Sequence, residues 1–127
     1  MKDIQNRTDI ELLVNSFYDN VKIDPLIGPI FNGAIKDWTP HLNKMYNFWE
    51  TVLLEVHSYS GAPFPPHAKM PLEKIHFDRW MFLFKNTVDN LFTGEKANEA
   101  KWRADKMAEL FQHKMEYFKK NNHQPLL

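Results

Sequence analysis

Residues 77–94, Phe-Asp-Arg-Trp-Met-Phe-Leu-Phe-Lys-Asn-Thr-Val-Asp-Asn-Leu-Phe-Thr-Gly, decide the fold class. Large apolar side chains recur here at spacings of three and four, which place them on one face of a helix: Phe77, Trp80, Met81, Phe84, Val88 and Leu91. Thr93 and Gly94 follow, and glycine is typical of the position just after a helix. The stretch therefore predicts a long amphipathic helix that ends before Gly94.

The same helical period extends through the chain on both sides of this stretch. The first three predicted starts combine a capping side chain or a proline with residues that suit a first helical turn, and the last two are placed by the return of the helical period. The predicted starts are Thr8, with Glu11 completing a capping box; Asp24, with Pro25 first in the helix; Thr39-Pro40; Leu72; and residue 95, for a last helix that reaches about residue 119. No strand-like alternation occurs, so the sequence predicts an all-α chain of four longer helices and one short one.

Residues 61–71, Gly-Ala-Pro-Phe-Pro-Pro-His-Ala-Lys-Met-Pro, interrupt the helical pattern. They hold four of the eight prolines, and proline removes a backbone donor and fixes φ. We therefore expect a stiff, shaped loop with at most one helical turn, around residues 67–70.

Length and composition predict one globular domain over residues 1–127, with residues 1–7 and 121–127 as frayed ends. The 16 Lys and Arg balance the 16 Asp and Glu, which argues against a partner bound through excess positive charge, such as nucleic acid or an anionic membrane. The absence of cysteine excludes disulfides, thiolate metal sites and thiol nucleophiles, and fits a cytoplasmic protein. No apolar run is long enough to span a membrane.

A few polar side chains fall on otherwise apolar helix faces. His41 shares a face with Met45 and Phe48, and Tyr18 and Trp80 lie on the core faces of two other helices. Each could be an ordinary core residue with a local hydrogen-bond partner, and His67, in the proline-rich loop, could be an ordinary surface residue. Taken together, they also fit a cofactor pocket with apolar walls and a few converging polar groups, such as a site for b-type haem.

Several short motifs, spread over about residues 8–118, resemble one known family. They are Phe17-Tyr18, Gly28-Pro29-Ile30-Phe31-Asn32, Trp38 with His41, Asn47-Phe48-Trp49, the loop from Pro66-His67 to Pro71, and Phe77-Asp78-Arg79-Trp80. In this order and spacing they resemble the group III truncated haemoglobins, which are bacterial globins with a two-over-two helical sandwich.

The resemblance implies roles for individual residues of this chain. His67 matches the proximal histidine that binds haem iron, and Tyr18, Trp80 and His41 match two distal donors and the histidine of the distal gate. Met45 stands where the family commonly has an aliphatic residue, so the distal volume here is expected to differ. The remaining expected haem contacts are Phe31, Phe48, Trp49 and Phe77, with His76 and Arg79 as candidates for binding the propionates.

The function implied is reversible, high-affinity binding of O2, NO or CO by haem b, in a monomer or weak dimer. Ligand detoxification or redox chemistry, either NO dioxygenation or a peroxidase-like reaction supported by an unidentified reductase, is favoured over bulk transport. Two alternatives stay open from the residues alone. One is a cofactor-free helical adaptor, and the other is a non-haem metal site formed by His41, His67 and a carboxylate.

Overall fold

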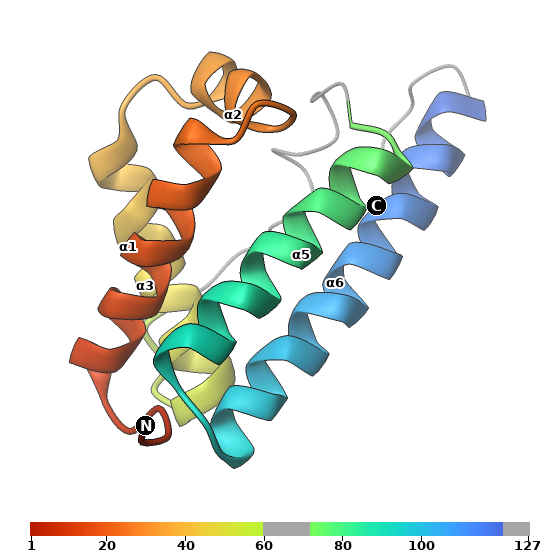
Figure 1. The fold of residues 1–127 in the computed structure, drawn as a ribbon. Coiled ribbons are helices and arrows are strands. Elements are labelled where there is room, and N and C mark those ends of the chain that lie inside the picture. The colour runs from red at the N-terminus through yellow and green to blue at the C-terminus, as the bar shows by residue number, and fades with distance from the viewer. Residues whose placement is uncertain (60–71, 121–127) are drawn as a thin grey trace.

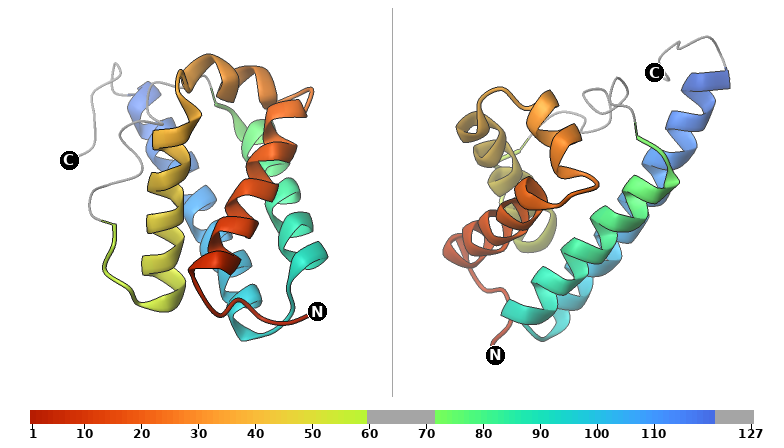
Figure 2. Two further views of the ribbon diagram at one scale, coloured as in Figure 1. Left: turned by 90° about the vertical axis from the view of Figure 1, so that its left-hand side faces the viewer. Right: turned by 45° about the horizontal axis from the view of Figure 1, so that its top comes forward.

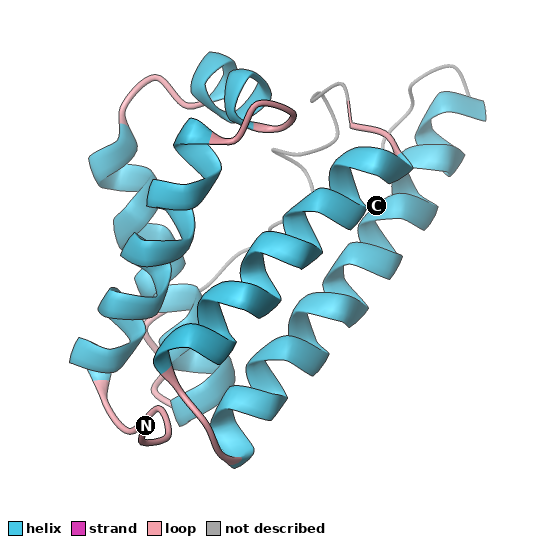
Figure 3. Ribbon diagram, in the orientation of Figure 1, coloured by secondary structure: helices cyan, strands magenta, loops and turns pink. Residues whose placement is uncertain are grey.

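The computed structural model describes residues 1–59 and 72–120, with side-chain surroundings as far as residue 117. His67 and the helical turn expected around it lie outside these residues, as does the tail 121–127. Within the described ranges the regular structure is entirely helical, as Figure 3 shows. The helices are α1 (Arg7–Ile23), α2 (Gly28–Ala34), α3 (Trp38–Leu54), α5 (Lys74–Leu91) and α6 (Glu95–Lys120). For the described part of the chain, the prediction of an all-α fold with four longer helices and one short one is thus confirmed.

The helices form two pairs, one laid across the other. α1 packs against α3, and α5 packs against α6, with the partners of each pair running in opposite directions (Figure 1). Further contacts of α1 with α5 and of α3 with α6 join the two pairs, while α2 packs on α1 (Figure 2). This arrangement is the two-over-two sandwich expected from the sequence.

Two of the predicted helix starts are displaced by two residues or fewer. α1 is capped by Asn6 rather than Thr8, because the Asn6 side chain accepts a hydrogen bond from the Asp9 N–H and the Asp9 carboxylate accepts one from the Gln5 N–H. α3 begins at Trp38, where Asp37 accepts from the Thr39 N–H. In both cases a side chain just before the predicted cap accepts a hydrogen bond from a free N–H group of the first turn.

The predicted start of the short helix is wrong by several residues. Asp24 does accept hydrogen bonds from the N–H groups of Leu26 and Ile27, as a cap would, but residues 25–27 form a turn and α2 begins only at Gly28. A Cβ atom at Gly28 would lie 2.9 Å from the carbonyl oxygens of Val21 and Lys22. Glycine therefore allows α2 to pack closely on the end of α1.

The N-terminal residues, which were expected to fray, are ordered. Asp3 accepts hydrogen bonds from the N–H groups of Lys96 and Ala97, and so caps α6 from more than 90 residues away in the chain. Ile4 is 2% exposed and joins the core. Gly94, with φ of +133°, leaves space for the Asp3 side chain, since a Cβ there would lie 2.6 Å from Cγ of Asp3. The burial of Ile4 and the hydrogen bonds of Asp3 to the start of α6 hold this segment in place.

The core consists of two clusters. The first cluster lies where α1 meets α3 and α5, and its members are Ile4, Ile10, Leu13, Val14, Phe17, Tyr18, Val21, Ile27, Phe31, Trp49, Leu53, Phe84, Val88, Phe92, Ala97, Ala100 and Ala104. The second cluster lies between the start of α5 and the later part of α6, and its members are Leu72, Phe77, Ala108, Phe111 and Met115. Trp80, Met81 and Met107 pack against both clusters.

Candidate functional site

A small, partly open cavity lies at the boundary between the two clusters, where four helices converge. Its lining is almost wholly apolar and is made by Phe17 and Tyr18 of α1, Met45, Phe48 and Trp49 of α3, Trp80 of α5, and Met107 and Phe111 of α6. We call it the four-helix cavity. Its volume is about 40 Å³. A water molecule needs about 10–15 Å³ by this measure, so the cavity has room for a small diatomic molecule.

Tyr18 contributes a phenol to this apolar wall. The residue is 6% exposed, and its ring lies edge-on to that of Phe17 at 4.9 Å between centroids. Burial raises the pKa of the Tyr18 hydroxyl above its ordinary value of 10, because a phenolate would lose its solvation there. The hydroxyl therefore keeps its proton at physiological pH and is able to donate a hydrogen bond.

Trp80 lines the same cavity from the opposite pair of helices. Its ring stacks on Phe84 at 5.7 Å, and Phe84 in turn stacks on Trp49 at 5.1 Å. Phe17 stands edge-on to both Trp80 and Phe84. These contacts fix the indole, whose N–H is a donor only. Two donors from different helices, Tyr18 and Trp80, thus border one small apolar space.

His41 and Phe31 lie beside Tyr18 rather than in the wall of the cavity. The half-buried His41 ring is edge-on to the Tyr18 ring at 5.1 Å, and the buried Phe31 ring is tilted toward it at 6.4 Å. The helical spacing predicted that His41 shares a face with Met45 and Phe48. The structure places the latter two at the cavity and His41 one turn earlier, next to Tyr18.

Both side chains that are candidates for binding the propionates make hydrogen bonds to other residues of the protein. His76 accepts a hydrogen bond at Nδ1 from the Glu73 N–H, which closes a capping box at the start of α5. Nε and Nη2 of Arg79 both lie 2.7 Å from Oδ1 of Asp24. That carboxylate also holds the turn before α2, so Arg79 has a structural task that sequence reasoning did not foresee.

Asp24 is buried, with its side chain 2% exposed, yet it is ionised. Burial alone would raise its pKa, but the hydrogen bond and charge of Arg79, with the N–H groups of Ile27 and Leu26, outweigh burial and lower the pKa. The ion pair therefore ties the end of α1 to α5.

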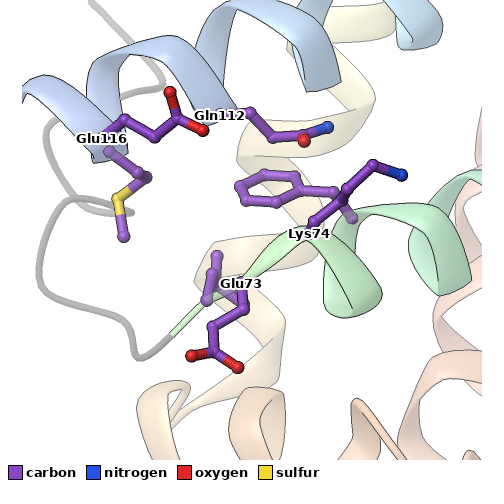
Figure 4. A pocket seen from close by; sticks show the side chains of 7 residues that line it. Glu73, Lys74, Gln112 and Glu116 are labelled. Atoms are coloured by element: carbon purple, nitrogen blue, oxygen red, sulfur yellow. The ribbon is translucent and has the colours of Figure 1, made fainter.

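Phe77 packs in the second cluster and not against the four-helix cavity. It lines a separate pocket of about 160 Å³ between α5 and α6, whose apolar floor it forms with Leu72 and Met115. Figure 4 shows Glu73 and Lys74 on one side of this pocket, with Gln112 and Glu116 of α6 on the other. The pocket is more polar than the four-helix cavity, and none of the described residues in its wall is a Tyr, Trp or His.

Three lining residues of the four-helix cavity were not foreseen as site residues: Phe17, Met107 and Phe111. Their helical spacing identified them as apolar face residues. Periodicity predicts that a side chain is buried, but it does not distinguish a cavity wall from a filled core. Only the crossing of the helices reveals that difference.

The residues around the four-helix cavity fit a porphyrin in chemical character. Aromatic and thioether side chains from all four helices offer apolar surface, and Tyr18 and Trp80 add polar groups from two of these helices. Among the described residues, no three His, Cys, Asp or Glu side chains are grouped so as to bind a metal ion. None of the helices in the described part of the chain is long and apolar enough to cross a membrane.

Comparisons with known proteins agree with this geometry. The family model of the bacterial-like globins matches residues 3–118. A group 3 truncated haemoglobin of Campylobacter jejuni subsp. jejuni is 34% identical over 112 residues, which cover 84% of this chain and 88% of the relative. The crystal structure of a group III truncated haemoglobin from Campylobacter jejuni superposes with a TM-score of 0.81 at 34% identity, covering 89% of this chain and 94% of the other. The chain therefore belongs to the bacterial-like globins, as a truncated haemoglobin of group III.

Proposed function

We propose that this protein binds O2, and also NO and CO, reversibly and with high affinity at a b-type haem, with His67 as the axial ligand. Haem-based binding of small gas ligands follows from membership of the globin family. The identity of the haem, the residue roles and the affinity are the proposal. When bound, haem would supply an iron atom that takes up the diatomic ligand, with Met45, Phe48, Trp49 and Trp80 among the residues that hold the macrocycle.

The observation that carries the proposal is that Tyr18 and Trp80 border one small apolar cavity. Bound O2 carries partial negative charge on its outer atom, and both side chains are able to donate a hydrogen bond to it. Such a bond to a charged group contributes about 1.5–3 kcal/mol. The lining is mostly apolar, so few other groups of the cavity wall compete for these donors. We therefore infer slow ligand release.

Met45 and His41 would control the space around the ligand. Met45 is flexible and polarisable, and it lines the cavity next to Tyr18. His41 lies edge-on to Tyr18 and would act as the gate through which the ligand enters. Phe31, whose ring is tilted toward that of Tyr18, would help to keep the phenol in position.

Tight binding favours a chemical role over transport, because a carrier that releases its ligand slowly delivers it poorly. NO dioxygenation or a peroxidase-like reaction, with electrons from a separate reductase, is the function that we propose. The buried Tyr18 hydroxyl retains its proton. Tyr18, or His41 beside it, would serve as the positioned proton donor that cleavage of an O–O bond requires.

The experiment is an absorption spectrum of the protein expressed with a supply of haem, for wild type, His67→Ala and His113→Ala. His113 is an exposed residue of α6 and serves as the control. We expect a Soret band in wild type and in His113→Ala, and a weakened or shifted band in His67→Ala. A wild-type protein that is colourless and takes up no added haemin would instead support the cofactor-free adaptor.

A further inference from the structure

Three aromatic rings form a compact group between the four-helix cavity and the surface. The rings of Tyr18, His41 and Trp38 contact one another: Tyr18 to His41 at 5.1 Å, Tyr18 to Trp38 at 5.6 Å, and Trp38 to His41 at 5.7 Å. Tyr18 is buried, whereas His41 and Trp38 are half-buried. The group therefore leads from the cavity wall toward solvent.

Lys22 holds the outer member of this group. Its Nζ lies 4.5 Å from the centre of the Trp38 ring, in a cation–π contact. Lys22 stands one helical turn after Tyr18 in α1, so both residues lie on the side of α1 that faces the start of α3. Asn32 of α2 donates a hydrogen bond of 3.1 Å to the Lys22 carbonyl, which fixes the backbone from which the side chain extends.

The contacts couple movement of His41 to Lys22. The imidazole is edge-on to both Tyr18 and Trp38, at interplanar angles of 83° and 87°. Rotation of His41 away from Tyr18 would also change its contact with the Trp38 ring. A Trp38 ring that is held by the Lys22 ammonium therefore restricts the movement of His41.

We propose that Lys22 and Trp38 are positioning residues that hold His41 closed beside Tyr18 and so limit ligand entry into the four-helix cavity. The inference rests on the proposed function, because it takes the cavity as the ligand site and His41 as its gate. Lys22 is not among the residues that line the cavity, and in this scheme it acts through Trp38.

The test measures carbon monoxide association by flash photolysis in haem-loaded wild type, Lys22→Met and Lys22→Arg. Methionine keeps much of the side-chain length but removes the charge, so we expect association to be about two- to five-fold faster, the range that a partly exposed cation–π contact supports. Arginine keeps a cation over the ring and should restore the wild-type rate. Lys36→Met, at an exposed position just before α3, removes the same charge and should leave the rate unchanged.

A second readout follows the Trp38 side chain itself. In the diamagnetic carbon monoxide complex, the NMR order parameter of the Trp38 indole N–H should fall in Lys22→Met and recover in Lys22→Arg. In a His41→Ala background the gate is removed, so Lys22→Met should no longer change the association rate.

Equal carbon monoxide association rates in wild type and Lys22→Met would overturn the inference. It would also be overturned if Lys36→Met raised the rate as much as Lys22→Met does, or if Lys22→Met still raised the rate in the His41→Ala background. Each of these results would leave haem binding, and hence the proposed function, intact. A wild-type protein that binds no haem would remove the proposed function itself.

Discussion

The first and second clusters differ in size and in how completely they are closed. In the first cluster, residues such as Leu13, Phe84 and Val88 are almost completely buried between α1, α3 and α5. In the second, every member retains a small exposed fraction, and a pocket of about 160 Å³ lies beside it with Glu73 and Glu116 on its rim. The first cluster is a filled interior, whereas the second is the border of a more open region.

The difference explains why the proposed ligand site lies where it does in this fold. The four-helix cavity lies at the boundary of the two clusters, and Trp80 and Met107 border it while packing against both. The donor Tyr18 belongs to the closely packed first cluster. A site that must admit a ligand is better placed at such a boundary than inside the filled cluster, since close-packed interiors resist insertion.

The largest expected effect is on the free energy of unfolding, which a substitution in the first cluster should lower more than one in the second. Phe84→Ala removes a ring that stacks between Trp49 and Trp80, and should lower the free energy of unfolding by about 3–5 kcal/mol. Met115→Ala, in the second cluster, should cost about 2 kcal/mol, because the open pocket beside it leaves room for relaxation. Urea denaturation of both variants measures the difference, and a Met115→Ala loss as large as that of Phe84→Ala would remove the distinction between the clusters.

The next effect concerns the ion pair that ties α1 to α5. Asp24→Asn keeps the size of the side chain but removes the charge that pairs with Arg79, and should destabilise the protein by about 1.5–3 kcal/mol. Asp78→Asn is the matched control, because its partner Lys74 and the carboxylate itself are both exposed. Thermal denaturation should show a clear fall in Tm for the first variant and almost none for the second.

Acid should weaken the protein through Asp3 and Asp24. Burial alone would raise the pKa of Asp3, but the N–H groups of Lys96, Ile4 and Ala97 and the Lys96 charge outweigh it and lower the pKa below the ordinary 3.8. The pKa of Asp24 is lowered too. A carboxyl with a lowered folded-state pKa stabilises the fold above its unfolded pKa, and this stabilisation is lost as the pH falls through the folded value.

Stability should therefore be retained above about pH 4 and decline below it. Asp3→Asn keeps one carboxamide oxygen as acceptor but loses the acceptor for one of the two α6 N–H groups, a hydrogen bond that contributes about 1 kcal/mol, and should be the smallest of these changes at neutral pH. Its loss of stability on acidification should also be shallower than that of wild type. Unfolding measured in urea at a series of pH values checks both points, and an acid slope identical to that of wild type would contradict the role of Asp3.

Much of the fold was predictable because the helices are amphipathic. The stripe from Phe77 to Leu91 predicted α5, and its end before Gly94 was confirmed. The helix ends that are fixed by tertiary contacts were harder to predict from the sequence. Asp3 caps α6 across the molecule, and no local pattern announces a cap from so distant a residue. The start of α2 depends on the close packing of Gly28 against α1, and not on the capping pattern at Asp24.

The lining of the cavity was also predictable in part, because the helical period indicates which side chains face the interior. Tyr18, Met45, Phe48, Trp49 and Trp80 border one cavity, as an aromatic pocket with converging polar groups required. The family resemblance made Arg79 a candidate for binding a propionate, and this role stays a prediction. The structure adds an ion pair with Asp24, 55 residues away, which the sequence did not predict. Pairing at such a distance in sequence depends on how α1 and α5 cross, which periodicity does not specify.

The central claim is that Tyr18 holds the bound ligand from the wall of the four-helix cavity. Its most direct test is the O2 dissociation rate of the haem-loaded protein, measured by stopped flow for wild type and Tyr18→Phe. Tyr46→Phe is the control, since that hydroxyl donates to Asn15 at the surface. Loss of one hydrogen bond to a charged group predicts release that is roughly 10- to 150-fold faster in Tyr18→Phe and unchanged in Tyr46→Phe. A dissociation rate for Tyr18→Phe equal to that of wild type would contradict the account.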